Sequence, residues 1–217
     1  MKKSILLVAL MSLITAAYSQ KMFNLTFLAS PQVSWLNSDS KSVNGGGGAV
    51  GFGYGVEGDF FLGSENYAFL TGMTVSSAGG SRIYDHSVQL NGTDLPLGTK
   101  VNYYLTNLEI PLALKMRTRD FSRFRYFAQF GLTNWINIKA RATTSDGSFQ
   151  KQTIRDEIRT FSTGLNVGAG LEYDLGHGNA ITGGLVYSNG FTNINANKGI
   201  NDVLTLKILR IRLGFVF

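Results

Sequence analysis

The last twelve residues of the chain, 206 to 217, read LKILRIRLGFVF. From position 209 onward, large apolar side chains occupy the odd positions, while Arg210 and Arg212 occupy even ones. In a β-strand, successive side chains point to opposite faces of the sheet. The segment is therefore predicted to be a strand with one apolar face and one charged face.

The same period of two occurs in seven further segments, at residues 24–35, 50–62, 67–75, 104–116, 124–142, 161–173 and 181–187. In each segment one face carries large apolar or aromatic side chains, and the other carries mostly Gly, Ser, Asn and charges of both signs. A soluble sandwich or lipocalin-like barrel would need the bulky apolar face inside, whereas a membrane barrel turns that face to lipid. We therefore expect an all-β fold, an eight-stranded antiparallel transmembrane β-barrel of the outer-membrane type.

The connections between these segments alternate in length. Short ones are predicted at residues 63–66, 117–123 and 176–179, and long polar ones at 36–48, 78–98, 143–159 and 190–203. A soluble sandwich has no reason to sort its loops by end, but outer-membrane barrels have short periplasmic turns and long extracellular loops. The pattern predicts a protein of the cell outer membrane with both termini periplasmic, residues 81–97 and 145–152 outside, and Ser64 and His177 in the periplasm.

The N-terminal segment resembles a secretory signal peptide. It has two lysines at positions 2 and 3, an apolar stretch over 5–15 and small residues at 17–19. The apolar stretch is shorter than the roughly 20 residues that a membrane-spanning helix needs. We predict a signal peptide over residues 1–19 and the barrel domain over 20–217. The chain has no cysteine, which excludes disulfides and a lipid-modified cysteine after the apolar stretch.

The inner faces of the predicted strands carry a charge network. Its predicted members are Glu57, Asp59, Glu109, Lys115, Arg125, Lys139, Arg141, Glu172, Arg210 and Arg212. Eight strands leave an interior that side chains just fill, and buried charges need partners. We expect a salt-bridged, closed lumen in which Arg210 and Arg212 pair with the glutamates. A proton or ion relay along the same carboxylates is the alternative. Asp174 and Arg117 are expected near the periplasmic rim, and Trp135 is expected to point inward.

Two prolines fall inside predicted strands, Pro31 and Pro111. Proline has no N–H to donate, and a closed barrel has no edge strand where that donor is dispensable. We expect a bulge or a register shift near each of them.

The outward face of the last strand ends in an aromatic residue. Its members are Leu209, Ile211, Leu213, Phe215 and Phe217. A terminal Phe on the closing strand is similar to the signal that the outer-membrane assembly machinery recognises, so this run is predicted to be the assembly signal. The aromatic side chains Tyr67, Tyr126 and Tyr173 are expected near the same membrane boundary.

No motif for catalysis or cofactor binding stands in a suitable context. The run GGGAVG over residues 46–51 precedes an alternating strand, whereas a dinucleotide fingerprint must open a helix. His86 and His177 fall in connections at opposite ends of the barrel and cannot converge on a metal.

We expect no cofactor, no metal and no enzymatic activity. A lipid-modifying enzyme remains an alternative, as do a narrow channel or transporter and an adhesin acting through residues 78–98. The small surplus of basic residues makes nucleic acid a poor partner.

Four segments resemble a known family. They are YLTNLEIPL at 104–112, FAQFG at 127–131, GAGLE at 168–172 and the terminal LGFVF at 213–217. The chain is similar to the small outer-membrane β-barrel proteins of Bacteroidota that include PorT. The resemblance implies an eight-stranded barrel and, for PorT itself, a role in type IX protein secretion. Expected partners are outer-membrane lipid and lipopolysaccharide, the assembly machinery, and a secretion apparatus or other envelope proteins.

Overall fold

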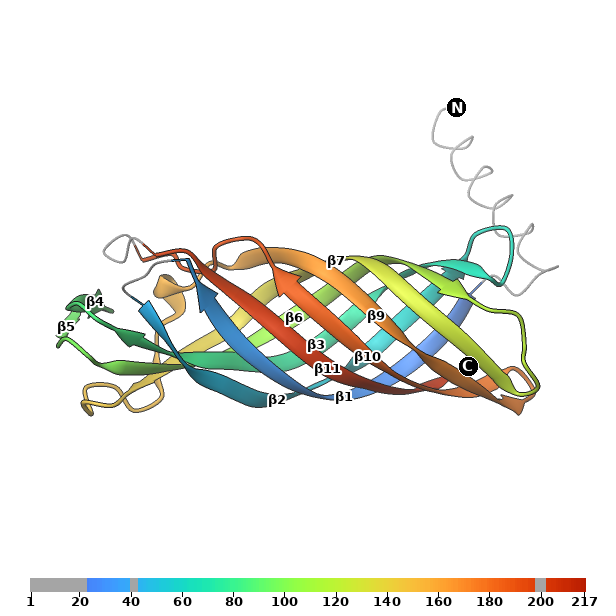
Figure 1. The fold of residues 1–217 in the computed structure, drawn as a ribbon, viewed down its shortest axis with the longest axis horizontal. Helices are drawn as coiled ribbons and strands as arrows, with labels where there is room; N and C mark the ends of the chain where they lie inside the picture. Colours follow the sequence, from blue (N-terminus) through green and yellow to red (C-terminus); the bar gives the residue numbers. More distant parts are fainter. Residues whose placement is uncertain (1–22, 40–42, 198–201) are drawn as a thin grey trace, which may run out of the picture.

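The computed structural model describes residues 23–39, 43–197 and 202–217; the predicted signal peptide lies outside them. Eight long strands dominate the chain: β1 (Phe23–Ser38), β2 (Val43–Phe61), β3 (Tyr67–Tyr84), β6 (Lys100–Arg117), β7 (Phe124–Thr144), β9 (Phe161–Gly176), β10 (Asn179–Gly190) and β11 (Leu204–Val216). Each pairs antiparallel with its neighbours, and the β1–β11 and β6–β7 pairings close the ring (Figure 1). The predicted eight-stranded barrel is confirmed.

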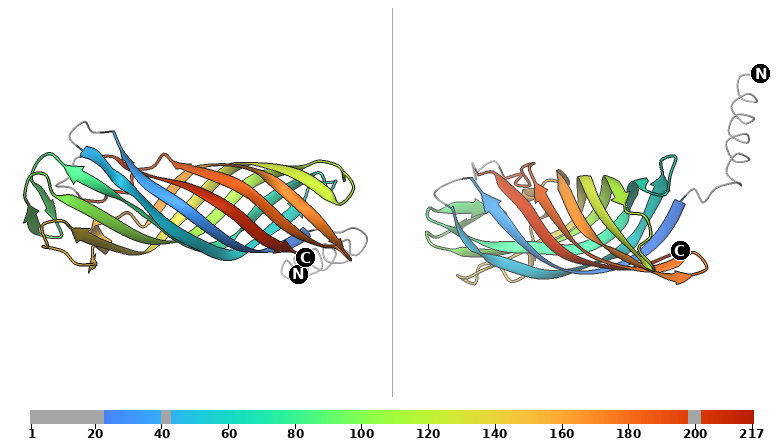
Figure 2. Two further views of the ribbon diagram at one scale, coloured as in Figure 1. Left: turned by 60° about the horizontal axis from the view of Figure 1, so that its bottom comes forward. Right: turned by 45° about the vertical axis from the view of Figure 1, so that its right-hand side comes forward.

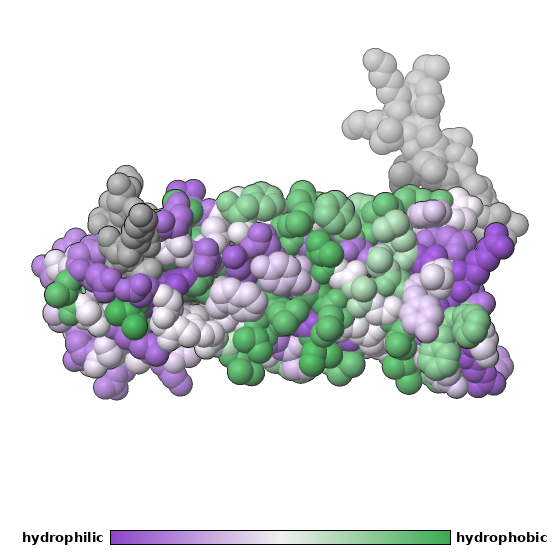
Figure 3. Space-filling model, in the orientation of Figure 1, coloured by the Kyte–Doolittle hydropathy of each residue, from purple (hydrophilic) through white to green (hydrophobic). Residues whose placement is uncertain are grey.

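Large apolar side chains cover the outside of this barrel. Outward residues such as Phe27, Phe130 and Ile211 are each about half exposed, and the polar residues between them are buried. Figure 3 shows apolar side chains gathered over the middle of the barrel, with more polar surface toward both ends. A protein surrounded by water rarely exposes so large a patch. The pattern is that of a barrel whose outer face meets lipid. Among the described residues, no helix is long and apolar enough to cross a membrane.

The two ends of the barrel differ. At one, here called the short-turn end, turns at 62–66, 118–123 and 177–178 connect the strands, and β1 begins and β11 ends there (Figure 1). At the other, the long-loop end, the strands run past their predicted limits. Extra elements fold there: a hairpin of β4 (Val88–Leu90) and β5 (Thr93–Leu95), the short strand β8 (Gln152–Thr153) and the 3-10 helix η2 (Arg155–Glu157) (Figure 2). The predicted long polar connections are therefore partly strand and partly folded structure.

The expectation of bulges at the two prolines is wrong. The β1–β2 register runs unbroken through Pro31, and the β6–β7 register runs unbroken through Pro111. On the other side of each proline the pairing lapses for two residues and resumes in the same register. Because proline has no N–H to donate, one of the two hydrogen-bond ladders of its strand is interrupted beside it. The strand pairing on either side of this gap keeps the same register.

A β-bulge lies instead between Thr106 and Asn107 on β6 and the facing part of β7. Thr106 pairs with Lys139, whereas Asn107 pairs with Asn137, so β7 carries one extra residue. An inserted residue moves every following side chain to the opposite face. Beyond the bulge, Lys139 is exposed and Arg141 half-buried on the outer face. The prediction that these two residues line the lumen is therefore wrong.

The C-terminal residue belongs to the closing seam of the barrel. The Phe217 amide donates to the Leu25 carbonyl at 2.8 Å, and the Leu25 amide donates back at 3.3 Å. The Phe217 ring packs edge-on against Phe27, with 5.5 Å between ring centroids, and lies 4.7 Å from the Phe215 ring. Half of the Phe217 side chain remains exposed, so its ring lies on the outer surface, available to lipid or to an assembly factor.

We expect Phe217→Ser to slow assembly more than it destabilises the barrel. Burying such a ring contributes at most about 1.5–3 kcal/mol, and the backbone hydrogen bonds of Phe217 survive the substitution. At native expression the variant should accumulate as protease-sensitive periplasmic protein, while the same variant refolded in detergent keeps the heat-modifiable gel mobility of a closed barrel. If the variant instead inserts normally into the membrane, the Phe217 ring contributes only packing and is not an assembly signal.

Candidate functional site: the barrel interior and its capped end

A dense charge cluster fills the interior near the short-turn end. Lys115 Nζ lies 2.8 Å from Asp59 Oδ2 and 2.7 Å from Glu172 Oε1, and its side chain is fully buried. Arg117 forms an ion pair with the same Asp59 carboxylate, and its Nε lies 3.4 Å from Glu172 Oε2. Arg117 is therefore part of the buried network and not a rim residue as predicted. Two cations and two carboxylates balance each other, which offsets the cost of burying them.

A second tier of charges lies deeper in the barrel. Arg212 pairs with Glu57, and Arg210 Nη2 lies 2.6 Å from Glu109 Oε2. The other oxygen of Glu109 accepts a 2.5 Å hydrogen bond from Ser76 Oγ. Of the three glutamates expected to face these arginines, Glu172 instead belongs to the Lys115 cluster.

An aromatic ring links the two tiers. The Phe127 ring points inward and lies under the Lys115 ammonium, with 4.6 Å from the nitrogen to the ring centroid. The Arg212 guanidinium lies 5.7 Å from the same centroid. A cation over an aromatic face gains electrostatic attraction without a further carboxylate. The inward orientation of Phe127 follows from its odd position in β7, opposite to Tyr126.

Uncharged amides and hydroxyls fill the next layer. Gln129 Nε2 donates to Asn166 Oδ1 at 2.8 Å, and Asn166 Nδ2 donates to Thr133 Oγ1 at 2.8 Å. Asn137 Nδ2 donates to Asn107 Oδ1 at 2.9 Å. A cavity of about 10 Å³ lies among these side chains, which is room for about one water molecule. This layer of the described interior is therefore closely packed and has room for little water.

Beyond this layer the interior becomes apolar, which the sequence did not indicate. Trp135 is 1% exposed and begins an apolar cluster, here called the apolar plug, that continues to the long-loop end. The cluster includes strand residues Leu36, Tyr84, Val101, Tyr103, Leu105, Leu204, Leu206 and Ile208, and loop residues Val88, Leu90, Leu95, Phe149, Ile154, Ile158 and Ile194. The loop residues show no period of two, so only their packing reveals them as core. We call this folded end, residues 85–99, 145–160 and 191–197, the cap.

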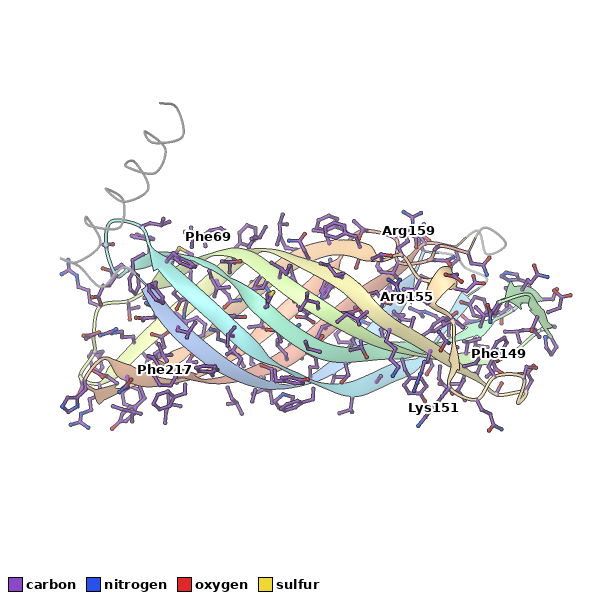
Figure 4. All side chains as sticks on the ribbon, turned by 180° about the vertical axis from the view of Figure 1, so that it is seen from behind. Phe69, Phe149, Lys151, Arg155, Arg159 and Phe217 are labelled. Atoms are coloured by element: carbon purple, nitrogen blue, oxygen red, sulfur yellow. The ribbon has the colours of Figure 1, made fainter. Side chains whose placement is uncertain are left out.

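The cap is tied together by specific hydrogen bonds. Tyr84 Oη and Tyr103 Oη lie 2.7 Å apart inside it. The amide of Asn91, in the β4–β5 hairpin, donates to Glu157 Oε1 at 2.8 Å, and Asn197 Nδ2 donates to the Gln89 carbonyl at 2.7 Å. Arg159 Nε donates to the Asn195 carbonyl at 3.0 Å. These bonds join loops that are distant in sequence, and the labelled Phe149, Arg155 and Arg159 all lie at this end of the barrel (Figure 4).

Arg125 lies at the short-turn rim and not in the lumen. It pairs with Asp120 in the neighbouring turn, and its Nη1 is 3.9 Å from Glu65 Oε2. The hydrogen bond from Arg125 lowers the pKa of the exposed Asp120 carboxyl. The sequence placed Arg125 on the correct strand, but its position next to the turn exposes it.

The acidic and histidine side chains of the described residues do not gather into a metal site. No three His, Asp or Glu side chains there could hold a metal ion. His86 and His177 are exposed at opposite ends. The glycine run over 46–51 lies within strand β2, next to β1 and β3, and opens no helix.

The sequence profile of the outer membrane protein beta-barrel domain matches residues 16–196, most of the chain. The protein belongs to this family. Membership in this family agrees with the apolar outer surface and the closed ring of strands. It also assigns the protein to the outer membrane. No curated protein matches the chain at a significant level.

The chain is similar to solved outer-membrane proteins at low sequence identity. Neisserial surface protein A is 12% identical, with a TM-score of 0.52 over 89% of this chain and 95% of that one. OprG from Pseudomonas aeruginosa is 13% identical with a TM-score of 0.44, over 90% of this chain and 94% of its own. The protease OmpT from Escherichia coli is 9% identical with a TM-score of 0.46, over 92% and 97%. Such likeness concerns the fold alone.

Proposed function

We propose that the protein is a non-enzymatic, non-conducting outer-membrane barrel that acts by binding other envelope components through its cap. The single observation that carries this proposal is the filled interior. Charge tiers, an amide layer and an apolar plug follow one another along the barrel. Side chains packed in this way leave little room for a solute to pass.

The cap offers apolar contact residues to a partner. Leu97 is 70% exposed and Phe191 is 58% exposed, although both adjoin the buried cluster. Exposed apolar side chains on a rigid surface are typical anchors of protein interfaces. The resemblance to the PorT group supports a secretion apparatus as the partner.

Pull-down of the native protein from outer membranes tests this proposal. The wild type should co-purify with a defined envelope protein, and Leu97→Asp should lose it. Phe121→Asp is the matched control, because Phe121 is 76% exposed in a turn at the opposite end and should keep the partner. If both variants keep the partner, or if both lose it, the cap is not the surface that binds it.

We further propose that the cap faces the cell exterior and the short turns face the periplasm, as the loop lengths suggest. The chain has no cysteine, so single cysteines report topology directly. Ser87→Cys in the cap should react with an impermeant maleimide on intact cells, whereas Ser64→Cys should react only after the membrane is opened. The reverse pattern would invert the orientation.

Because the lumen is filled, we also predict that the barrel conducts no steady ion current. Reconstituted into planar bilayers, the wild type should show no steady large conductance, because the cavity in the described amide layer holds only about 10 Å³. A matched preparation of a known open porin, measured in the same bilayers, controls for insertion. A stable large pore in the wild type would favour the channel alternative over the proposed closed barrel.

A further inference from the structure

The β-bulge in β7 creates a basic groove on the outside of the barrel. The groove has a volume of about 470 Å³ and crosses the outer faces of β2, β3, β6 and β7. Small residues such as Gly48, Ala49 and Ser77 line its floor, and Lys139, Arg141 and Lys151 contribute its cationic lining. Lys151 reaches the groove because its amide donates to Thr143 Oγ1 on β7 at 3.0 Å, next to the turn before β8 (Figure 4).

The groove lies where the apolar outer belt ends. Along the β6–β7 ladder, outward residues change from the apolar pair Leu108 and Ile136 to Thr106 opposite Lys139, and then to Tyr104 opposite Arg141. Val50, which also lines the groove, is 87% exposed and apolar. Tyr and basic side chains are favoured at the boundary between hydrocarbon and headgroups. The position therefore corresponds to lipid headgroups.

The cations in the groove have no anionic partner among the residues that the structure describes. None of Lys139, Arg141 and Lys151 forms an ion pair within the described part of the chain. Arg141 Nε is buried and has no hydrogen-bond acceptor among those residues. A buried, unsatisfied N–H of a charged group is costly, and an oxyanion would satisfy it. Arginine and lysine together are well suited to a phosphate group.

We propose that this groove binds the phosphorylated headgroup of an outer-membrane glycolipid. The phosphate would lie among Lys139, Arg141 and Lys151, sugar hydroxyls would meet polar groups such as Asn102 and Ser81, and an acyl chain would leave over Val50 toward the apolar belt. The inference uses the family's location in the outer membrane. It also rests on the proposed orientation, which places the groove in the outer leaflet, where lipid A carries its phosphates. It does not depend on cap binding.

The test measures binding of purified lipid A to the detergent-solubilised full barrel by native mass spectrometry. Diphosphoryl lipid A should bind the wild type about 10-fold more tightly than it binds the triple variant Lys139→Gln, Arg141→Gln and Lys151→Gln, since charge-assisted hydrogen bonds to phosphate are lost. The matched control removes three exposed or half-exposed cations elsewhere, Lys207→Gln, Arg119→Gln and Arg123→Gln, and should bind like the wild type. All substituted residues are exposed or half-buried, and heat-modifiable gel mobility verifies that both variants are closed barrels.

Equal loss in both triple variants would mean nonspecific attraction and would overturn the site. Equal binding of dephosphorylated lipid A would overturn the role of the phosphate. Competition with inorganic phosphate is a further test. Displacement of the lipid by low-millimolar phosphate would point to a soluble anion, and not a lipid, as the ligand of the groove. Failure of phosphate to compete supports the lipid. Because the cap pull-down and this assay use different residues and readouts, failure of one does not imply failure of the other.

Discussion

Lys115→Met should lower the free energy of unfolding by about 3–5 kcal/mol, the usual consequence of removing one partner from a buried ion pair. Lys115 lies between Asp59 and Glu172 and is fully buried. Methionine keeps most of the side-chain volume, so the loss reports charge and not a cavity. After the substitution only Arg117 remains to balance both carboxylates. Urea unfolding of the refolded barrel in phosphatidylcholine bilayers, followed by gel mobility, measures the change.

Two companion variants separate the charge effect from other causes. Lys207→Met removes a cation from the outer face of β11 and should change stability by less than about 0.5 kcal/mol. The double variant Lys115→Met, Glu172→Gln should recover part of the loss, because one uncompensated carboxylate is also removed. Equal small losses at Lys115 and Lys207, or no recovery in the double variant, would contradict the balanced cluster.

Trp135→Ala should destabilise the barrel by about 3–5 kcal/mol, the range for truncating a large buried aromatic side chain. Trp135 is 1% exposed and closes the boundary between the amide layer and the apolar plug. Gly164 is packed against it: a Cβ atom at Gly164 would lie only 2.7 Å from two carbons of the Trp135 ring. The neighbouring strand is thus already fitted around the indole, so the cavity left by alanine cannot collapse easily.

Trp35 supplies the matched control for this prediction. It lies on the outer surface, stacked on Tyr187 with 6.3 Å between ring centroids. Trp35→Ala should cost about 0.5–1.5 kcal/mol, the scale of one aromatic pair. The same urea titration in bilayers measures both variants. A loss at Trp35 as large as that at Trp135 would show that the apolar plug contributes little beyond the outer belt.

The sequence alone determines the strands and most of their faces. A period of two is a local property, because each peptide reverses the side-chain direction. Residues such as Glu109 and Arg212 could therefore be placed inside from their neighbours alone. Loop lengths likewise distinguish the two ends before any contact is known. The sequence did not indicate which cation meets which carboxylate, because partners on different strands depend on register around the whole ring.

The tertiary structure decided the position of the bulge, the basic groove and the burial of the loop residues. The bulge opposite Thr106 exists only in the alignment of β7 with β6, and it turns Lys139 and Arg141 outward to form the basic groove. Phe149, Ile154 and Ile194 sit in connections without any apolar period, yet they are buried in the cap because the barrel mouth offers them an apolar surface. Periodicity describes a residue relative to its own strand, whereas bulges, ion pairs and loop packing arise between segments distant in the chain.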